Sequence, residues 1–162
     1  MRRVYLTATA IAFGCLALAG RSERPAIIYN PSPSAPLGYY RTLAPTSPAR
    51  GDWVLITAPD PARELADARG YSPKTVPMIK SVAALGGDRV CAADGLISIN
   101  GKVVATRMRL DHRGRPMPWW SGCLTLNNNE VFVLNRGAPS SFDGRYFGVI
   151  QRQAIRARLV HL

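Results

Sequence analysis

Three lysines, Lys74, Lys80 and Lys102, are the candidates for a general base in this chain of 162 residues. A lysine acts as a base only when its pKa falls from about 10.4 towards 7 or 8, which burial among apolar side chains can achieve. Lys74 lies in a turn between prolines and Lys102 follows an Asn-Gly turn, so both are expected to be exposed and protonated. Lys80 alone lies inside an apolar run, VPMIKSVAAL. A lysine there either reaches solvent at a strand edge or takes part in chemistry.

The histidines and cysteines offer no competing chemistry. His112 lies in the polar segment DHRGRP and His161 is next to the C-terminus, so both are expected to be solvated. Cys91 and Cys123 are far apart and have no C-x-x-C spacing, so neither a metal site nor a cofactor is expected. Because both lie in the part of the chain predicted to be exported, they favour one disulfide. A serine activated by a lysine remains as the nucleophile and base.

Four short segments carry these serines and this lysine. They read NPSPSAPLGYYR at 30–41, RGDWVLI at 50–56, MIKSVAALGGDRV at 78–90 and SFDGR at 141–145. The third segment resembles I-K-R-V-x-x-L-P-G-D and the last resembles S-x-D-S-R. One S-x-S motif is uninformative, but the ordered set is specific. In this set the chain resembles the type I signal peptidases, which are Ser/Lys proteases, and in particular their conjugative-transfer, TraF-type branch.

The resemblance implies a catalytic role for three residues. Ser34 matches the nucleophile and Lys80 its general base. Ser32 matches the serine whose hydroxyl helps to bind the oxyanion, together with the backbone N–H of Ser34. Such preorganised donors each contribute about 3 to 4 kcal/mol to catalysis.

The last motif implies supporting roles. Ser141 matches the serine that orients the lysine, and Asp143 matches the carboxylate that pairs with Arg145. Asp143 either supports the shape of this motif through its pair with Arg145 or takes part directly in catalysis, and the two interpretations have similar weight. The chain departs from the family motifs at Gly86, where the family has proline, and at Gly144, where it has serine. Neither departure removes a reactive group.

The elements that must position these residues are mainly β. Two short strands joined by Asn100-Gly101 are the clearest local signal, because this pair tolerates the positive φ angles of a type I′ turn. One short helix is expected at 60–70, with Pro61 near its start and Gly70 as its stop. Strands are expected at 51–57, 96–107, 130–135 and 147–160. We therefore predict antiparallel sheets with the core of a signal peptidase and one short helix.

The N-terminal segment 1–21 predicts export of the rest of the chain. Two arginines precede an uncharged stretch from Val4 to Gly20, and Arg21 follows. This stretch is close to the lower length limit for crossing a bilayer, and its ALAG end fits a cleavage site, so it is a signal anchor or a cleavable signal peptide. We favour a transmembrane anchor, with residues 22–162 forming one periplasmic domain. The chain has no room for the large accessory domain of housekeeping enzymes, and the resemblance implies that the cysteine pair braces the short insert DHRGRPMPWWSGC.

The net charge of +11 favours anionic membrane surfaces, nucleic acid or acidic partners. Arg152, Arg156 and Arg158 share a parity in the expected strand 147–160, which places them on one face, opposite Ile155 and Leu159. A solvated sheet face explains them better than a nucleic-acid stripe, so no nucleic-acid partner is expected.

Three hypotheses about function follow. In the first, the chain is a membrane-anchored serine endopeptidase that cleaves exported or membrane-inserted precursors at the outer face of the inner membrane. The resemblance implies that the precursor is a conjugative pilin, whose own N-terminus can resolve the acyl-enzyme and cyclise the product. In the second, the chain is a signal peptidase of broad specificity. In the third, it is a catalytically silent binding domain of a conjugation apparatus.

Overall fold

A computed structural model describes residues 25–162 of the chain. The predicted anchor at 1–21 lies outside this range. Within 25–162, no helix is long and apolar enough to cross a membrane.

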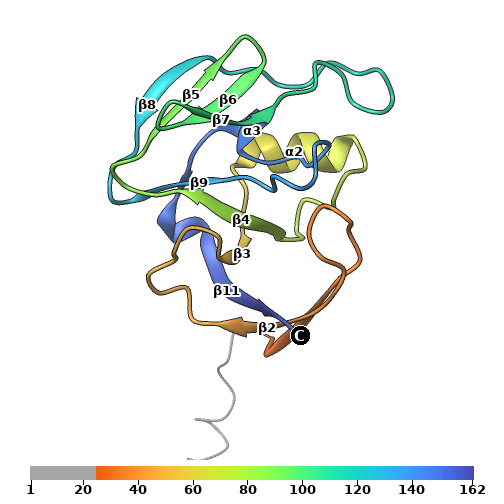
Figure 1. Ribbon diagram of the computed structural model, residues 1–162. Helices are drawn as coiled ribbons and strands as arrows, with labels where there is room; N and C mark the ends of the chain where they lie inside the picture. Colours follow the sequence, from red (N-terminus) through yellow and green to blue (C-terminus); the bar gives the residue numbers. More distant parts are fainter. Residues whose placement is uncertain (1–24) are drawn as a thin grey trace, which may run out of the picture.

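Two antiparallel sheets form the framework of the described chain (Figure 1). The larger sheet has seven strands in the order β1-β2-β11-β3-β4-β9-β10, and the smaller has four in the order β7-β6-β5-β8. The larger sheet contains β1 (Ile27–Asn30), β2 (Gly38–Leu43), β3 (Trp53–Ile56), β4 (Met78–Ala84), β9 (Glu130–Val133), β10 (Ile150–Gln151) and β11 (Ile155–His161). The smaller sheet contains β5 (Arg89–Ala93), β6 (Leu96–Ile99), β7 (Lys102–Thr106) and β8 (Gly122–Thr125). The prediction of a mainly antiparallel β fold is confirmed.

The smaller sheet forms around the predicted hairpin. Asn100 and Gly101 have φ angles of 52° and 80°, the left-handed values that a type I′ turn requires, and they join β6 to β7. Val90, Ala92, Ile97 and Ile99 of β5 and β6 are buried in one apolar cluster with Phe132 and Leu134. This cluster packs the smaller sheet against the segment around β9.

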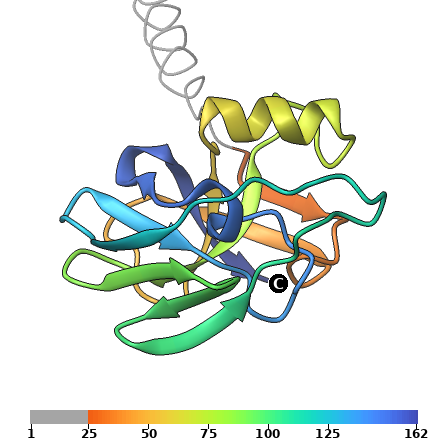
Figure 2. The same cartoon turned by 90° about the horizontal axis from the view of Figure 1, so that it is seen from above.

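Three short helical segments complete the part of the fold formed by residues 25–162. α2 (Asp60–Ala68) starts next to Pro61 and is followed by Gly70 at a φ of 70°, as expected. Figure 2 shows α2 along one side of the molecule, outside the strands. Its buried residues Ala62 and Ala66 pack against Phe142. This helix therefore covers the region of the last motif.

The prediction of a single helix is wrong, because two further helical segments precede and interrupt the strand expected at 147–160. Phe147 ends α3 (Gly144–Phe147), and η1 (Arg152–Ala154) is a single 3-10 turn between β10 and β11. The apolar residues of this region do not alternate as one strand requires, because Phe147 and Ile150 pack in the core from different elements. Arg156 and Arg158 do share the outer face of β11, where Arg158 pairs with Asp52, whereas Arg152 lies in the 3-10 turn.

Candidate active site

Lys80 lies on β4 with its side chain directed into the core. It lies on the same face of β4 as Met78 and Val82, which belong to the apolar cluster between β3, β4 and β9. Only 4% of the surface of Lys80 is exposed. Its Nζ donates a hydrogen bond of 3.0 Å to Ser141 Oγ. Burial lowers the pKa of Lys80 to about 8, against the opposing attraction of Asp143. Lys80 is therefore a buried amine that can be neutral near physiological pH.

Asn30 shapes the segment that carries the two predicted serines. Its Nδ2 donates to the backbone carbonyls of Ser32, Ala35 and Pro36 at 2.9, 3.2 and 2.9 Å. Its Oδ1 accepts a bond of 3.0 Å from the Ser32 N–H. Asn30 is 5% exposed, so one buried amide holds the whole loop after β1. The prolines restrict φ angles in this loop, but the amide fixes its path.

The two serine hydroxyls in this loop contact each other. Ser32 Oγ and Ser34 Oγ are 3.1 Å apart, and the Ser34 N–H donates to Ser32 Oγ at 3.4 Å. Ser34 and Lys80 line the same cleft, but within residues 25–162 no hydrogen bond joins Ser34 Oγ to Lys80 Nζ. The structure thus brings the predicted nucleophile and base to one cleft. Ser34 is hydrogen-bonded to Ser32, and Lys80 is hydrogen-bonded to Ser141.

Asp143 and Arg145 form a fully buried ion pair. Arg145 Nε and Nη2 donate to the two carboxylate oxygens of Asp143 at 2.9 and 2.8 Å, and both residues are at most 1% exposed. Arg145 also donates to the carbonyls of Asn135, Ala138 and Pro139. Asp143 in addition caps α3 by accepting from the Arg145 N–H. Every one of these contacts orders the loop that carries Ser141.

Asn135, two residues after the end of β9, links the parts of the site and is not among the site residues predicted from the sequence. Its Nδ2 donates to the carbonyls of Ser34 and Ile79 at 2.6 and 3.2 Å, and its Oδ1 accepts from the Ser81 N–H at 2.8 Å. Its own N–H donates to Asp143 at 3.0 Å. This side chain, 2% exposed, ties the loop of Ser34 to the residues on both sides of Lys80. The one sign of Asn135 in the sequence is its position as a polar residue at the end of the apolar run EVFVLN.

The cleft around Ser34 and Lys80 has a volume of about 1250 Å³ and a mostly apolar wall. The apolar residues come from β1, β4, the loop before β4 and the insert after β7. They include Ile28, Val76, Met78, Ile79, Met108, Leu110 and Phe142. A cleft of this size and apolar lining suits an extended apolar polypeptide. In the part of the chain that the structure describes, no three His, Cys, Asp or Glu side chains gather as a metal site requires.

Comparison with known proteins identifies the family of this chain. The profile of the family described as signal peptidase, peptidase S26, matches residues 1–161. The chain belongs to this signal peptidase family. Plasmid transfer protein TraF of Escherichia coli is 34% identical over 142 residues, which cover 78% of this chain and 76% of the relative. Conjugal transfer protein TraF of Agrobacterium fabrum is 36% identical over 131 residues, covering 75% and 73%. A solved signal peptidase I from Enterococcus faecalis covers 71% of this chain and 98% of its own, with a TM-score of 0.42 and 20% identity.

The resemblance to signal peptidases and to their TraF-type branch is thereby confirmed. The motifs of the S26 family are also joined to one another in the fold. Arg50 of the second motif donates through Nε and Nη2 to the carboxylate of Asp88 in the lysine motif, at 3.0 and 2.6 Å. Asp88 in turn accepts from the Leu85 N–H, so this pair fixes the turn between β4 and β5.

One departure from the S26 motifs has a steric cause. A Cβ atom at Gly144 would lie 2.6 Å from the carbonyl oxygen of Val133 and 2.7 Å from the ring of Phe132. The serine that the family carries at this position would not fit without a shift of the backbone. The glycine at 144 is therefore required by packing in this chain.

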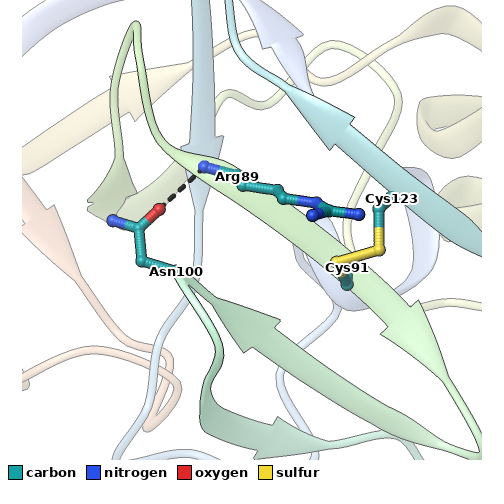
Figure 3. The surroundings of a disulfide bond; sticks show 4 residues. All are labelled: Arg89, Cys91, Asn100 and Cys123. Carbon is teal, nitrogen blue, oxygen red and sulfur yellow. Dashed lines mark hydrogen bonds between the residues drawn. A yellow bond between two sulfur atoms is a disulfide. The ribbon is translucent and has the colours of Figure 1, made fainter.

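The disulfide between Cys91 and Cys123 is confirmed (Figure 3). The two cysteines lie directly opposite each other on the neighbouring strands β5 and β8. The bond closes a loop that contains β6, β7 and the insert, as expected. Trp120 of the insert also donates to the Gly144 carbonyl at 3.1 Å, so the insert is attached to the last motif as well.

Proposed function

We propose that this protein is a serine endopeptidase in which Ser34 is the nucleophile and Lys80 the general base. The observation that carries the proposal is the buried amine of Lys80, hydrogen-bonded to Ser141 beneath a cleft that Ser34 also lines. An amine with a lowered pKa can accept the proton of a serine hydroxyl at neutral pH. Ser141 orients the amine, and the pair of Asp143 and Arg145 supports the loop of Ser141.

Substrate binding would rearrange the serine pair. In the structure Ser34 Oγ is bonded to Ser32 Oγ. When the scissile carbonyl enters, its oxygen takes the hydrogen bonds of the Ser32 hydroxyl and the Ser34 N–H. This exchange frees Ser34 Oγ to turn towards Lys80. Catalytic hydrogen bonds commonly tighten only in the substrate complex, which fits the separate partners of the two groups.

The reaction would then proceed through an acyl-enzyme. Ser34 Oγ attacks the carbonyl carbon, and its proton passes to Lys80 Nζ. The C–N bond breaks as Lys80 gives this proton to the leaving amine, so an ester on Ser34 remains. Attack by water on the ester gives a linear product, and attack by the amino terminus of the substrate gives a cyclic one that contains one water less.

We further propose that the domain acts at the periplasmic face of the inner membrane on exported or membrane-inserted precursors. The disulfide supports an oxidising compartment. Apolar side chains that are 55% to 63% exposed gather on the strands nearest the N-terminal segment and on the last residue of the chain. They are Ile27, Tyr29, Leu37, Tyr39 and Leu162. Such a patch and the net charge of +11 both suit a bilayer surface with anionic headgroups.

The relatives named as plasmid and conjugal transfer proteins suggest a conjugative pilin precursor as the substrate. The test is to incubate the full chain with the pilin precursor of its transfer system and to measure the product mass. Ser34→Ala and Lys80→Ala should each abolish processing. Ser140→Ala, at an exposed serine of the same cleft, and Lys74→Ala, at an exposed lysine, are the matched controls and should process normally.

The outcomes separate the three hypotheses. Processing of the pilin precursor but not of general secretory precursors supports the proposal, and a product lighter by one water shows cyclisation. Equal processing of both kinds of precursor would favour a signal peptidase of broad specificity. Normal processing by the Ser34→Ala protein, or no processing by the wild type, would contradict the proposal.

A further inference from the structure

Arg107, the residue after β7, is a buried cation with a free hydrogen-bonding edge. It is 4% exposed, and its Nη1 donates to the carbonyl of Trp120. Its Nε and Nη2 have no hydrogen-bond partner among residues 25–162. The guanidinium stacks on Trp119, with Cζ 3.6 Å from the ring centroid, and this contact offsets part of the cost of burying the charge. The stacking satisfies the flat face of the guanidinium but not its in-plane donors.

The same edge of the guanidinium binds a carboxylate at two other places in this chain. Nε and Nη2 of Arg145 hold both oxygens of Asp143, and Nε and Nη2 of Arg50 hold both oxygens of Asp88. These two parallel donors match the geometry of a carboxylate. Arg107 presents the identical pair of donors without an acceptor within the described chain.

A second cavity, of about 720 Å³, adjoins Arg107 on the smaller sheet. Its wall contains Arg107, Arg109 and Asp94, so two cations and one acid face it and leave a positive balance. A carboxylate has two oxygens in one plane, which match the two parallel donors of Arg107, and its single negative charge equals the positive balance of this wall. Trp119, which is 48% exposed, also lines the cavity and stacks on the guanidinium, so the cavity and the flat face of Arg107 share this ring.

The cavity and the catalytic cleft share a wall. Arg107 and Arg109 line the cavity, whereas the alternate residues Met108 and Leu110 line the cleft. The Met108 N–H donates to the Tyr146 hydroxyl at 3.2 Å, which fixes this strip of backbone. A polypeptide that occupies the cleft is thus separated from the cavity by the width of one extended segment.

We propose that the cavity beside Arg107 binds a carboxylate of the polypeptide substrate, carried either by its C-terminus or by an acidic side chain. The two oxygens accept hydrogen bonds from Nε and Nη2 of Arg107, and Arg109 adds attraction at the mouth. This proposal rests on the proposed function in taking the ligand to be part of a peptide. The binding is nevertheless measurable without any cleavage.

The test is a titration of the full chain, in a non-ionic detergent, followed by the ¹H–¹⁵N resonances of the Arg107 Nε–H and the tryptophan indoles. N-acetylalanine supplies a C-terminal carboxylate, and N-acetylaspartate α-amide supplies a side-chain carboxylate. N-acetylalaninamide is the neutral control, and inorganic phosphate is the dianionic one. We expect saturable shifts at Arg107 with one or both carboxylates, with affinity about tenfold or more above that for the amide.

Two variants locate the binding. Arg107→Lys keeps the charge but loses the two parallel donors, and should weaken carboxylate binding about tenfold. Arg109→Lys makes the same substitution in the same cavity and should change the affinity less than about threefold. The wild-type titration remains decisive should Arg107→Lys fail to fold.

Three results would each overturn the proposal. They are equal shifts with the carboxylates and the amide, the absence of a saturable shift at Arg107, and tighter binding of phosphate than of the carboxylates. Loss of peptidase activity in Ser34→Ala with unchanged carboxylate binding would leave both inferences standing. Carboxylate binding in a protein that cleaves no precursor would contradict the proposed function alone.

Discussion

Replacing Lys80 by methionine should stabilise the folded protein at neutral pH while it abolishes peptidase activity. Lys80 is 4% exposed, and burial lowers its pKa from 10.5 to about 8. Each tenfold step in proton affinity is worth about 1.4 kcal/mol, so burial of the charged amine costs the folded state about 3 kcal/mol. Methionine has a similar length and no charge, and therefore removes this cost.

The sign of the pH dependence follows from the direction of the pKa shift. Between about pH 8 and 10.5 the unfolded chain binds more protons at this lysine than the folded chain does, so the stability of the wild type rises with pH in this range. Removal of the buried charge by Lys80→Met should contribute about 3 kcal/mol at pH 7 and about 1 kcal/mol at pH 10. Loss of the hydrogen bond to Ser141 subtracts about 1 kcal/mol at both pH values, so the net stabilisation should be about 2 kcal/mol at pH 7 and close to zero at pH 10.

The assay is urea unfolding of the full chain in non-ionic detergent at several pH values from 7 to 10, with wild type and variant compared at each. Lys102→Met is the control, because Lys102 is exposed on β7 and its replacement removes no buried charge. A difference between wild type and Lys80→Met that stays constant from pH 7 to 10 would refute the reasoning. The same pKa predicts that kcat/KM of the wild type rises with pH and reaches half of its plateau near pH 8.

Three further predictions concern the residues that hold the site together. Asn135→Asp, which loses the amide donors to Ser34 and Ile79, should lower kcat at least about tenfold with little change in KM, measured by steady-state kinetics. An unchanged kcat would mean that this amide does not position the nucleophile. Gly144→Ser, which restores the residue of the family motif, should destabilise the protein by about 1 to 3 kcal/mol in denaturant unfolding, because its Cβ has no room. Joint replacement of Cys91 and Cys123 by alanine should cost about 3 to 4 kcal/mol of stability under oxidising conditions, and a loss below about 1 kcal/mol would contradict the loop-closure argument.

The Asn-Gly pair is enough to predict the hairpin at Asn100, because this pair sets its own φ angles. The apolar run around Lys80 leaves open whether the amine is buried or reaches solvent at a strand edge, and the structure shows that it is buried. The prediction of one strand over 147–160 is wrong, although its β-branched and apolar residues favour a strand locally. In the fold Phe147 ends α3, and the 3-10 turn Arg152–Ala154 divides the rest into β10 and β11.

The sequence by itself determined which side chains could react: one lysine in apolar surroundings, two serines among prolines, and a cysteine pair suited to a disulfide. The tertiary structure alone decided how they are held. Asn135 contacts Ser34 across 101 positions of sequence because the fold places the loop after β1 beside the segment that follows β9, and no local pattern encodes such a contact. The unpartnered donors of Arg107 are likewise visible only in the fold, because hydrogen-bond satisfaction depends on what surrounds a side chain in space.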